Sequence, residues 1–398
     1  MRRVMVFSAS RAEYGLLKPI LRGITTSSRL KLDLVIGGAH LAPGHGCTKR
    51  EIMNDALPIT FCINGAQASD SPGAIVEFVG RGITEIAAYF AAQPPDIVVI
   101  LGDRYELLIP LAGALVNRIP VAHLCGGETT EGALDEQVRH AATKMAHLHF
   151  PSTFQYARCL RRMGEEAWRI NVVGAPGVEN IIKEEMMTPE ELDAAFGIDV
   201  TRRTLLITYH PETLTRDGDP EKEAAALTAA LKEFLDYQQV ITYPGMEVGC
   251  RGVIKAWESY VEKNPNARLY KSLGSRGYLG VMREAAAVVG NSSSGIIEAP
   301  SLKIPTVNIG DRQKGRVRAE SVIDVPCIKA EIVAGLQKAL YDAEFRRSLE
   351  NVNNPYDPYG DGNVGGRVVS VLESVPLDRR LLEKKLDFPT EQELLNLP

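Results

Sequence analysis

The stretch HLCGGETTEGALDEQVRHAATKMAHLHFP, residues 123–151, decides the fold that we predict for this chain. Its first residues end an apolar run, 119–124, which is typical of a buried strand. Gly126 and Gly127 then allow a tight turn or a close approach of the backbone to a ligand. Glu128 follows directly, so we expect it at the carboxyl end of that strand, where open α/β sheets bind their ligands.

A helix is predicted to begin at the acidic pair Asp135 and Glu136. Arg139 and His140 lie one turn further along, so Glu136 can share a helix face with one or the other. Carboxylates, an arginine and a histidine near the end of a strand suit proton transfer beside an anionic substrate. The competing interpretation is a capped helix whose charges are solvated.

The composition is typical of a soluble globular protein, and 398 residues are too many for one ordinary core, which indicates two domains. The net charge of −5 gives no electrostatic case for nucleic acid, so an anion site must be a local cluster. No apolar run is long enough to span a membrane, and the first residues do not resemble a signal peptide. The six cysteines are scattered without a C-x-x-C pair, which favours a reducing cytoplasm and argues against a structural zinc.

Two more predicted strand ends in the first half carry arginines. Residues 4–7 predict a strand, and the loop after it holds small residues and Arg11 before a helix expected from about Leu16. This loop suits a phosphate or ribose, or is an ordinary βα turn; it lacks the G-x-G-x-x-G dinucleotide pattern. The run DIVVIL predicts another strand, followed by Asp103 and Arg104, which are placed for ligand contact or for a salt-bridged turn.

A second α/β series follows the first without a linear repeat, which predicts two Rossmann-like domains facing a cleft. His210 follows the first strand of this series, 204–208. A histidine at this position can be a general acid, a phosphate ligand or a turn residue. Residues 170–173 are expected to be the last strand of the first series. The predicted parts are an N-terminal domain (1–175), a hinge (176–188), a C-terminal domain (189–365) and a helical tail (366–398).

The run VVGNSSSG, residues 288–295, predicts a strand end that opens a helix through Glu298. The hydroxyl and backbone N–H groups of Ser292 and Ser293 would form an anion cradle at the start of this helix. Glu298 is placed to bind a ribose diol, and Arg312 belongs to a basic cluster after the next strand. The alternative is a well-capped helix with no ligand.

The linked motifs resemble one known family over most of the chain. They are SASRAEYGLLKP (8–19), LGDRYE (101–106), the stretch 123–153, HPET (210–213) and GNSSSGIIEAPSLKIPTVNIGDRQKGR (290–316). The chain resembles the hydrolysing UDP-N-acetylglucosamine 2-epimerases of sialic acid biosynthesis. The GGE and D-E-x-x-R-H motifs look like this hydrolysing branch rather than the non-hydrolysing relatives.

The resemblance implies a glycosyltransferase-B-like fold that binds UDP in its cleft. It also implies that the N-terminal domain is the sugar and catalytic side and that the C-terminal domain is the UDP side. The implied reaction removes UDP from C1 and the proton from C2, and water then adds to the glycal to give N-acetylmannosamine and UDP. No metal or redox cofactor is expected. The implied catalytic set is Asp103, Glu128, Glu136 and His210. The implied substrate- and UDP-binding residues are Arg11, Arg104, Arg139, Ser292, Ser293, Glu298 and Arg312.

Other functions stay open at this point. Relatives that act on UDP-2,4-diacetamido-2,4,6-trideoxyglucose (UDP-N,N'-diacetylbacillosamine) in legionaminic acid pathways share the same motifs. A glycosyltransferase of the same fold would need an acceptor, and a UDP-sugar sensor would bind without turnover. In each case we expect a cytoplasmic homo-oligomer, dimer or tetramer, that takes a UDP-sugar and binds neither nucleic acid nor membrane.

Overall fold

The computed structural model describes residues 1–41, 49–64, 71–212, 220–245 and 247–395. The chain forms two compact units, each with one parallel sheet. Unit 1 comprises Met1–Glu128, Asp135–Asn180 and Tyr356–Pro398, and unit 2 comprises Thr129–Leu134 and Ile181–Pro355. No described helix is both long enough and apolar enough to cross a membrane.

The sheet of unit 1 has six strands in the order β3-β2-β1-β4-β5-β6, and its neighbouring strands run parallel. This is the Rossmann order, in which the direction of winding reverses between β1 and β4. The strands are β1 (Arg2–Ser8), β2 (Leu30–Ile36), β3 (Ile59–Cys62), β4 (Ile97–Leu101), β5 (Val121–Leu124) and β6 (Leu148–Phe150).

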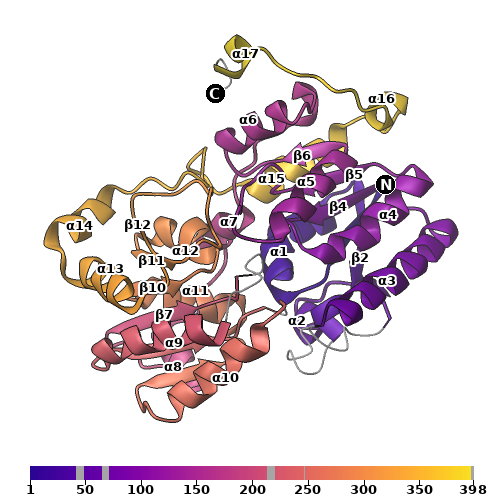
Figure 1. Cartoon of the computed structure of the whole chain (residues 1–398). Helices are drawn as coiled ribbons and strands as arrows, with labels where there is room; N and C mark the ends of the chain where they lie inside the picture. The colour runs from indigo at the N-terminus through magenta and orange to yellow at the C-terminus, as the bar shows by residue number, and fades with distance from the viewer. Residues whose placement is uncertain (42–48, 65–70, 213–219, 246, 396–398) are drawn as a thin grey trace. The chain divides into compact units, whose positions relative to one another are not determined.

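Helices cover both faces of this sheet (Figure 1). Successive residues of β1 alternate between two apolar cores, with Val4 and Val6 in one and Met5 and Phe7 in the other. Burial on both faces explains why these strands are continuous apolar runs in the sequence. The helices are α1 (Arg11–Thr26), α2 (Lys49–Asn54), α3 (Pro72–Ala92), α4 (Leu108–Asn117), α5 (Asp135–Met145), α6 (Phe154–Arg162), α15 (Val364–Ser374), α16 (Arg379–Leu382) and α17 (Glu391–Leu395), with α7 (Pro176–Lys183) leading into unit 2.

Unit 2 repeats this architecture with the order β12-β11-β10-β7-β8-β9. Leu205 and Ile207 of β7 face one core, and Leu206 faces the other. The strands are β7 (Thr204–Thr208), β8 (Gln238–Thr242), β9 (Ala267–Tyr270), β10 (Ala287–Gly290), β11 (Thr306–Ile309) and β12 (Val322–Val325). The helices are α8 (Pro189–Phe196), α9 (Pro220–Leu231), α10 (Cys250–Val261), α11 (Gly274–Glu284), α12 (Ser294–Ile297), α13 (Lys329–Tyr341) and α14 (Ala343–Ser348).

Three local predictions differ from the structure. Helix α1 begins at Arg11 rather than near Leu16, because Ser10 and Glu13 form a capping box around its first turn. Residues 170–173 form no strand; only Ile170 makes an isolated bridge, to His149. The predicted helix through Glu298 is interrupted, since α12 ends at Ile297 after four residues and a 3₁₀ segment follows.

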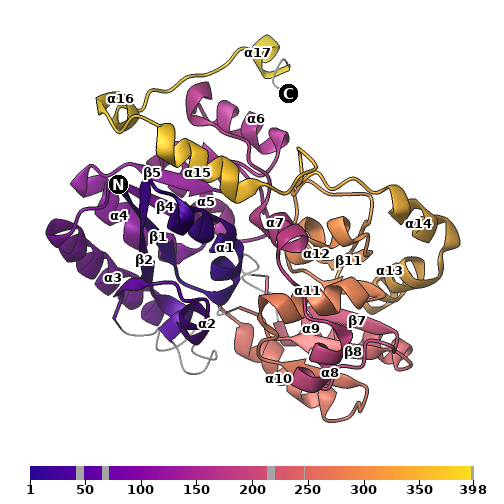
Figure 2. The ribbon, with the colours of Figure 1, turned by 180° about the vertical axis from the view of Figure 1, so that it is seen from behind.

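The unit boundaries also differ from the predicted domain boundaries. Residues 366–398 are not a separate tail: Val368 and Leu372 of α15 are fully buried in the core of unit 1. Helix α15 packs along α1 (Figure 2), where a methyl group of Val369 lies against Gly23. The predicted hinge, 176–188, contains α7 and lies across the boundary between Asn180 and Ile181.

Candidate functional site

A buried arginine contacts three of the predicted acidic residues of unit 1. The Arg139 side chain, on α5, has no exposed surface. Its Nη1 donates to the Glu136 carboxylate (2.6 Å) and to the backbone carbonyl of Glu128 (3.0 Å). Its Nη2 forms an ion pair with Asp103, from the turn after β4. Glu136 also lies 3.0 Å from Nε2 of His140, so all these residues of the predicted cluster meet at one place.

This geometry changes the role expected for Arg139. We predicted that Arg139 binds the substrate or UDP; in the structure its guanidinium has no exposed surface and contacts groups of unit 1. A buried charge is stable only when it is paired and hydrogen-bonded, and here its partners are carboxylates of the predicted catalytic set. The structure therefore favours Arg139 as the residue that organises Asp103, Glu136 and the backbone of Glu128.

The three carboxylates differ in exposure. The side chains of Asp103 and Glu136 keep 24% and 18% of their surface exposed, whereas Glu128 is buried at 2%. Glu128 accepts a hydrogen bond from the Ser152 hydroxyl at 2.6 Å. Asp103 and Glu136 are thus the more accessible groups for a substrate, and Glu128 lies beneath the surface.

The predicted arginines Arg11 and Arg104 follow β1 and β4, the adjacent strands at which the winding reverses. Arg11 is half-buried in the first turn of α1, and Arg104 pairs with Glu106 at 3.1 Å. Glu13 is buried nearby and accepts from the backbone N–H groups of two residues, at 2.7 and 2.8 Å. Burial, with the charge of Glu106, raises the pKa of Glu13 to about 7. This carboxyl group was not among the predicted site residues, although the S-x-x-E capping signature contains it.

The candidate residues of unit 2 are arranged around Asn291, after β10. Its side chain is fully buried, accepts from the backbone N–H of His210 (2.7 Å) and donates to the His210 carbonyl (2.8 Å). Its own backbone carbonyl accepts from Nη1 of Arg312 (3.2 Å) and from Gln313 (2.9 Å). Asn291 therefore fixes two predicted residues, His210 after β7 and Arg312 after β11, the two strands that flank β10.

Glu247, which was not among the predicted site residues, contacts the same two residues. Its carboxylate lies 3.2 Å from Nδ1 of His210 and 3.2 Å from Nη2 of Arg312, and its side chain is 9% exposed. Glu247 comes from the loop after β8, next to β7 in the sheet. The only available signal was its position, an acidic residue shortly after a buried strand.

The predicted anion cradle at Ser292 and Ser293 has the expected hydroxyl groups, but the helix that follows it is short. The Ser292 hydroxyl lies 3.0 Å from that of Ser294, which in turn lies 2.7 Å from the Tyr278 hydroxyl. Ser293 precedes α12 without a side-chain cap, and Glu298, 8% exposed, lies just after the C-terminal end of α12. A four-residue helix contributes little macrodipole, so an anion bound here would be held mainly by the hydroxyl groups and Arg312.

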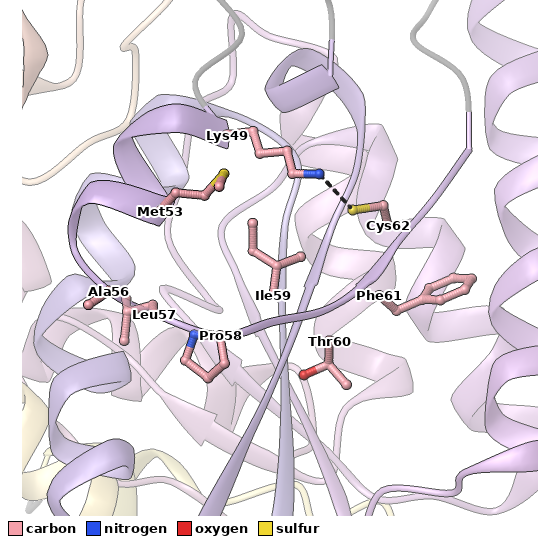
Figure 3. A pocket seen from close by; sticks show the side chains of 9 residues that line it. All are labelled: Lys49, Met53, Ala56, Leu57, Pro58, Ile59, Thr60, Phe61 and Cys62. Carbon is pink, nitrogen blue, oxygen red and sulfur yellow. Dashed lines mark hydrogen bonds between the residues drawn. The ribbon is translucent and has the colours of Figure 1, made fainter.

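A hollow of about 590 Å³ lies elsewhere in unit 1, beside the edge strand β3 and α2 (Figure 3). Its lining is mainly apolar, with Met53, Ile59 and Phe61 among the side chains drawn. Nζ of Lys49 lies 3.9 Å from Sγ of Cys62 across it. None of the predicted site residues lines this hollow, so it is separate from the candidate site.

Solved structures share this fold. A UDP-GlcNAc 2-epimerase from Neisseria meningitidis bound to UDP-GlcNAc has a TM-score of 0.78 and 18% identity, over 94% of this chain and 99% of that one. The Methanocaldococcus jannaschii UDP-GlcNAc 2-epimerase in complex with UDP-GlcNAc and UDP has a TM-score of 0.76 and 20% identity, with the same coverage. The chain thus belongs to the predicted class, α/β proteins with two Rossmann-like units of the glycosyltransferase-B-like type.

The family described as UDP-N-acetylglucosamine 2-epimerase matches residues 22–373. A Campylobacter jejuni protein, "GDP/UDP-N,N'-diacetylbacillosamine 2-epimerase (hydrolyzing)", is 37% identical over 81% of this chain and 84% of its own. A Legionella pneumophila protein, "UDP-N,N'-diacetylbacillosamine 2-epimerase (hydrolyzing)", is 32% identical over 96% and 98%. A UDP-N-acetylglucosamine 2-epimerase of Neisseria meningitidis is 29% identical over 89% and 96%. The chain belongs to this family, and it is an enzyme of the hydrolysing UDP-sugar 2-epimerase type.

Proposed function

We propose that the substrate is UDP-2,4-diacetamido-2,4,6-trideoxyglucose, and that the products are UDP and 2,4-diacetamido-2,4,6-trideoxymannose. The observation that carries this choice is the similarity to the Campylobacter and Legionella proteins, whose names both give the diacetamido sugar. UDP-N-acetylglucosamine, our first expectation from the sequence, becomes the second candidate, supported by the less similar Neisseria relative.

In the proposed reaction a carboxylate of unit 1 removes the proton from C2 while the C1–O bond to UDP breaks. The electron pair of the C2–H bond forms the C1–C2 double bond of a glycal, and UDP leaves with the electrons of the C1–O bond. Water then adds its hydroxyl to C1, and a proton returns to C2 from the opposite face. A C–H bond beside an acetamido group is weakly acidic, so the base must be positioned closely.

We assign the base to Asp103 or Glu136, because both are partly exposed and both are held by Arg139. Glu128 stays in the proposed catalytic set, as the buried partner of Ser152 that supports the same group of residues. Arg139 stabilises the ionised forms of Asp103 and Glu136, since an adjacent positive charge favours a carboxylate.

Unit 2 is assigned to binding and release of UDP. Arg312 offers a planar fork of donors that matches phosphate oxygens, and the hydroxyl groups of Ser292 and Ser293 add further donors. Glu298 is assigned to the ribose diol. His210, whose Nδ1 lies 3.2 Å from Glu247, is assigned to give a proton to the departing phosphate. These donors stabilise the charge that develops on UDP as the C1–O bond breaks.

The test is a parallel assay of UDP release with UDP-2,4-diacetamido-2,4,6-trideoxyglucose, its GDP counterpart and UDP-N-acetylglucosamine, with products identified by proton NMR. We expect the diacetamido UDP-sugar to give the highest kcat/KM. A higher value for UDP-N-acetylglucosamine would overturn the substrate proposal while leaving the chemistry intact.

The same assay in D₂O tests the mechanism. The glycal route places solvent deuterium at C2 of the product, whichever sugar is preferred. A product without that label would exclude elimination and readdition. Turnover only in the presence of an added acceptor would instead indicate a glycosyltransferase, and binding without turnover would indicate a sensor.

A further inference from the structure

A buried histidine contacts two of the segments that carry the carboxylate cluster of unit 1. His123 is the third of the four residues of β5 and has no exposed surface. Its Nε2 lies 2.7 Å from the carbonyl oxygen of Gly102, and its Nδ1 lies 3.3 Å from the hydroxyl of Thr143. A carbonyl oxygen only accepts, so Nε2 carries the hydrogen. Burial lowers the pKa of His123 to about 3, so the ring is neutral and Nδ1 accepts from Thr143.

These two contacts join the segments that carry the proposed base. Gly102 directly precedes Asp103 and has a φ of +82°, so its carbonyl belongs to the turn that aims the Asp103 carboxylate. Thr143 lies one helical turn after Arg139 on α5, the helix that also carries Glu136. The imidazole ring is therefore a cross-link between the Asp103 turn and the helix of Arg139.

Gly126 leaves the space that the His123 ring occupies. A Cβ atom on Gly126 would lie 2.8 Å from Nδ1 of His123 and 3.1 Å from the Thr143 hydroxyl. Cys125, just before it, holds a left-handed φ of +61°, which is costly for a residue other than glycine. The turn between β5 and Glu128 is thus folded tightly over His123 and Thr143.

We propose that His123 is a positioning residue for the epimerase reaction: its Nε2–H fixes the Gly102 carbonyl and thereby holds Asp103 in its ion pair with Arg139. The ring does not touch substrate. This inference rests on the proposed assignment of Asp103 to the catalytic set, but not on which UDP-sugar is preferred.

The neighbouring strand provides a matched control. His149 of β6 stands opposite His123 in the sheet register and is equally buried. Its Nε2 lies 2.7 Å from Glu165 rather than from the Asp103 turn. A substitution at His149 therefore removes a buried imidazole from the same sheet without removing the contact with Gly102.

The experiment compares His123→Phe, His123→Gln and His149→Phe at a temperature where each variant is folded by circular dichroism. Phenylalanine removes the donor, whereas the glutamine amide N–H can replace Nε2–H. A misplacement of about 1 Å costs on the order of 10²-fold in rate, so His123→Phe should lower kcat by roughly 10- to 100-fold with KM nearly unchanged. His123→Gln and His149→Phe should stay within a few-fold of the wild type.

Equal losses in His123→Phe and His149→Phe would mean that general destabilisation is the cause, and an equal loss in His123→Gln would mean that ring volume matters rather than the donor. Either result overturns the proposal. If His123→Phe does not fold, ¹⁵N NMR of the wild type decides: protonation on Nδ1, or titration between about pH 5 and 8, would contradict the assignment. The parallel assay of the wild type distinguishes failure of this proposal from failure of the proposed function. The wild type still releases UDP if only the role of His123 is wrong, and it does not if the proposed function is wrong.

Discussion

The carboxylates of unit 1 provide the first residue-scale prediction. Glu136→Gln keeps the shape and can still accept from Arg139, but it removes the charge that takes a proton. Positioned acid–base groups contribute roughly 10²- to 10⁴-fold, so kcat should fall by about that factor while UDP affinity survives. Glu128→Gln should behave similarly, since Glu128 belongs to the proposed catalytic set.

Glu131 is the control for this experiment, because it lies between these glutamates in the sequence and its side chain is 56% exposed. Glu131→Gln should keep full activity. Steady-state rates measure kcat, and calorimetric titration measures the affinity for UDP. Normal turnover in both Glu128→Gln and Glu136→Gln would leave Asp103 as the base.

Glu13 gives a pH-dependent prediction. Its pKa is raised from 4.5 to about 7 by burial and by Glu106, with Arg104 acting in the opposite direction. A carboxyl group with a raised folded-state pKa stabilises the fold below its ordinary pKa, and that contribution is lost as pH rises through the folded pKa. The stability of the wild type relative to Glu13→Gln should therefore fall by roughly 2–3 kcal/mol between pH 4.5 and 7. Urea unfolding of both proteins across this range measures it, and a constant difference would contradict the buried, protonated carboxyl group.

At the scale of elements, Gly290 fixes the approach of β10 to β7. Its φ is +129°, and a Cβ atom there would lie 2.0 Å from the carbonyl oxygen of Thr208. Gly290→Ala should destabilise unit 2 by more than the 1–3 kcal/mol typical of backbone strain alone, so about 3 kcal/mol or more. Because His210 and Asn291 follow these strands, UDP affinity should fall as well.

Gly80 offers the matching control, since a Cβ atom there meets nothing within 4 Å and its φ is not in the left-handed region. Gly80→Ala, in the exposed interior of α3, should raise stability by up to about 1 kcal/mol. Thermal unfolding followed by circular dichroism distinguishes the two variants. An unchanged melting temperature for Gly290→Ala would mean that β7 and β10 are not packed as closely as described.

Elements were predictable where one local pattern sufficed. The strand 204–208 was predicted at its observed limits, since a strand buried on both faces is a continuous apolar run. The start of α1 was missed although Ser10 and Glu13 carry the capping signature. The role of Glu247 was not predictable, because its pairing with His210 and Arg312 depends on strand order and not on spacing in the sequence.

At the scale of the whole molecule, the two Rossmann-like sheets were predictable, but the path of the chain between the units was not. The sequence predicts a helical tail over residues 366–398; it does not show which sheet the apolar face of α15 covers. The segment Thr129–Leu134 likewise belongs to unit 2, where the Glu131 N–H donates to the Lys314 carbonyl at 3.0 Å, although residues before and after it belong to unit 1.

The last prediction tests this assignment of the C-terminal segment. Deleting residues 356–398 removes three fully or nearly fully buried side chains of α15, Val364, Val368 and Leu372, from the core of unit 1. It also removes the backbone carbonyls that accept from the buried guanidinium of Arg169, including that of Leu381 at 2.8 Å. Each buried aliphatic side chain contributes about 1.5–3 kcal/mol, so the total approaches the 5–15 kcal/mol that stabilises a typical domain.

We therefore expect the truncated chain to lose the cooperative unfolding transition of unit 1 and to be cut there by protease. Deleting only residues 389–398, after the 67% exposed Phe388, should leave that transition within a few degrees of its original temperature. Calorimetry of both truncations beside the full chain separates the two cases. A chain ending at residue 355 that still melted like the full-length protein would mean that residues 356–398 are an appendage, because a unit that had lost α15 from its core could not keep the same stability.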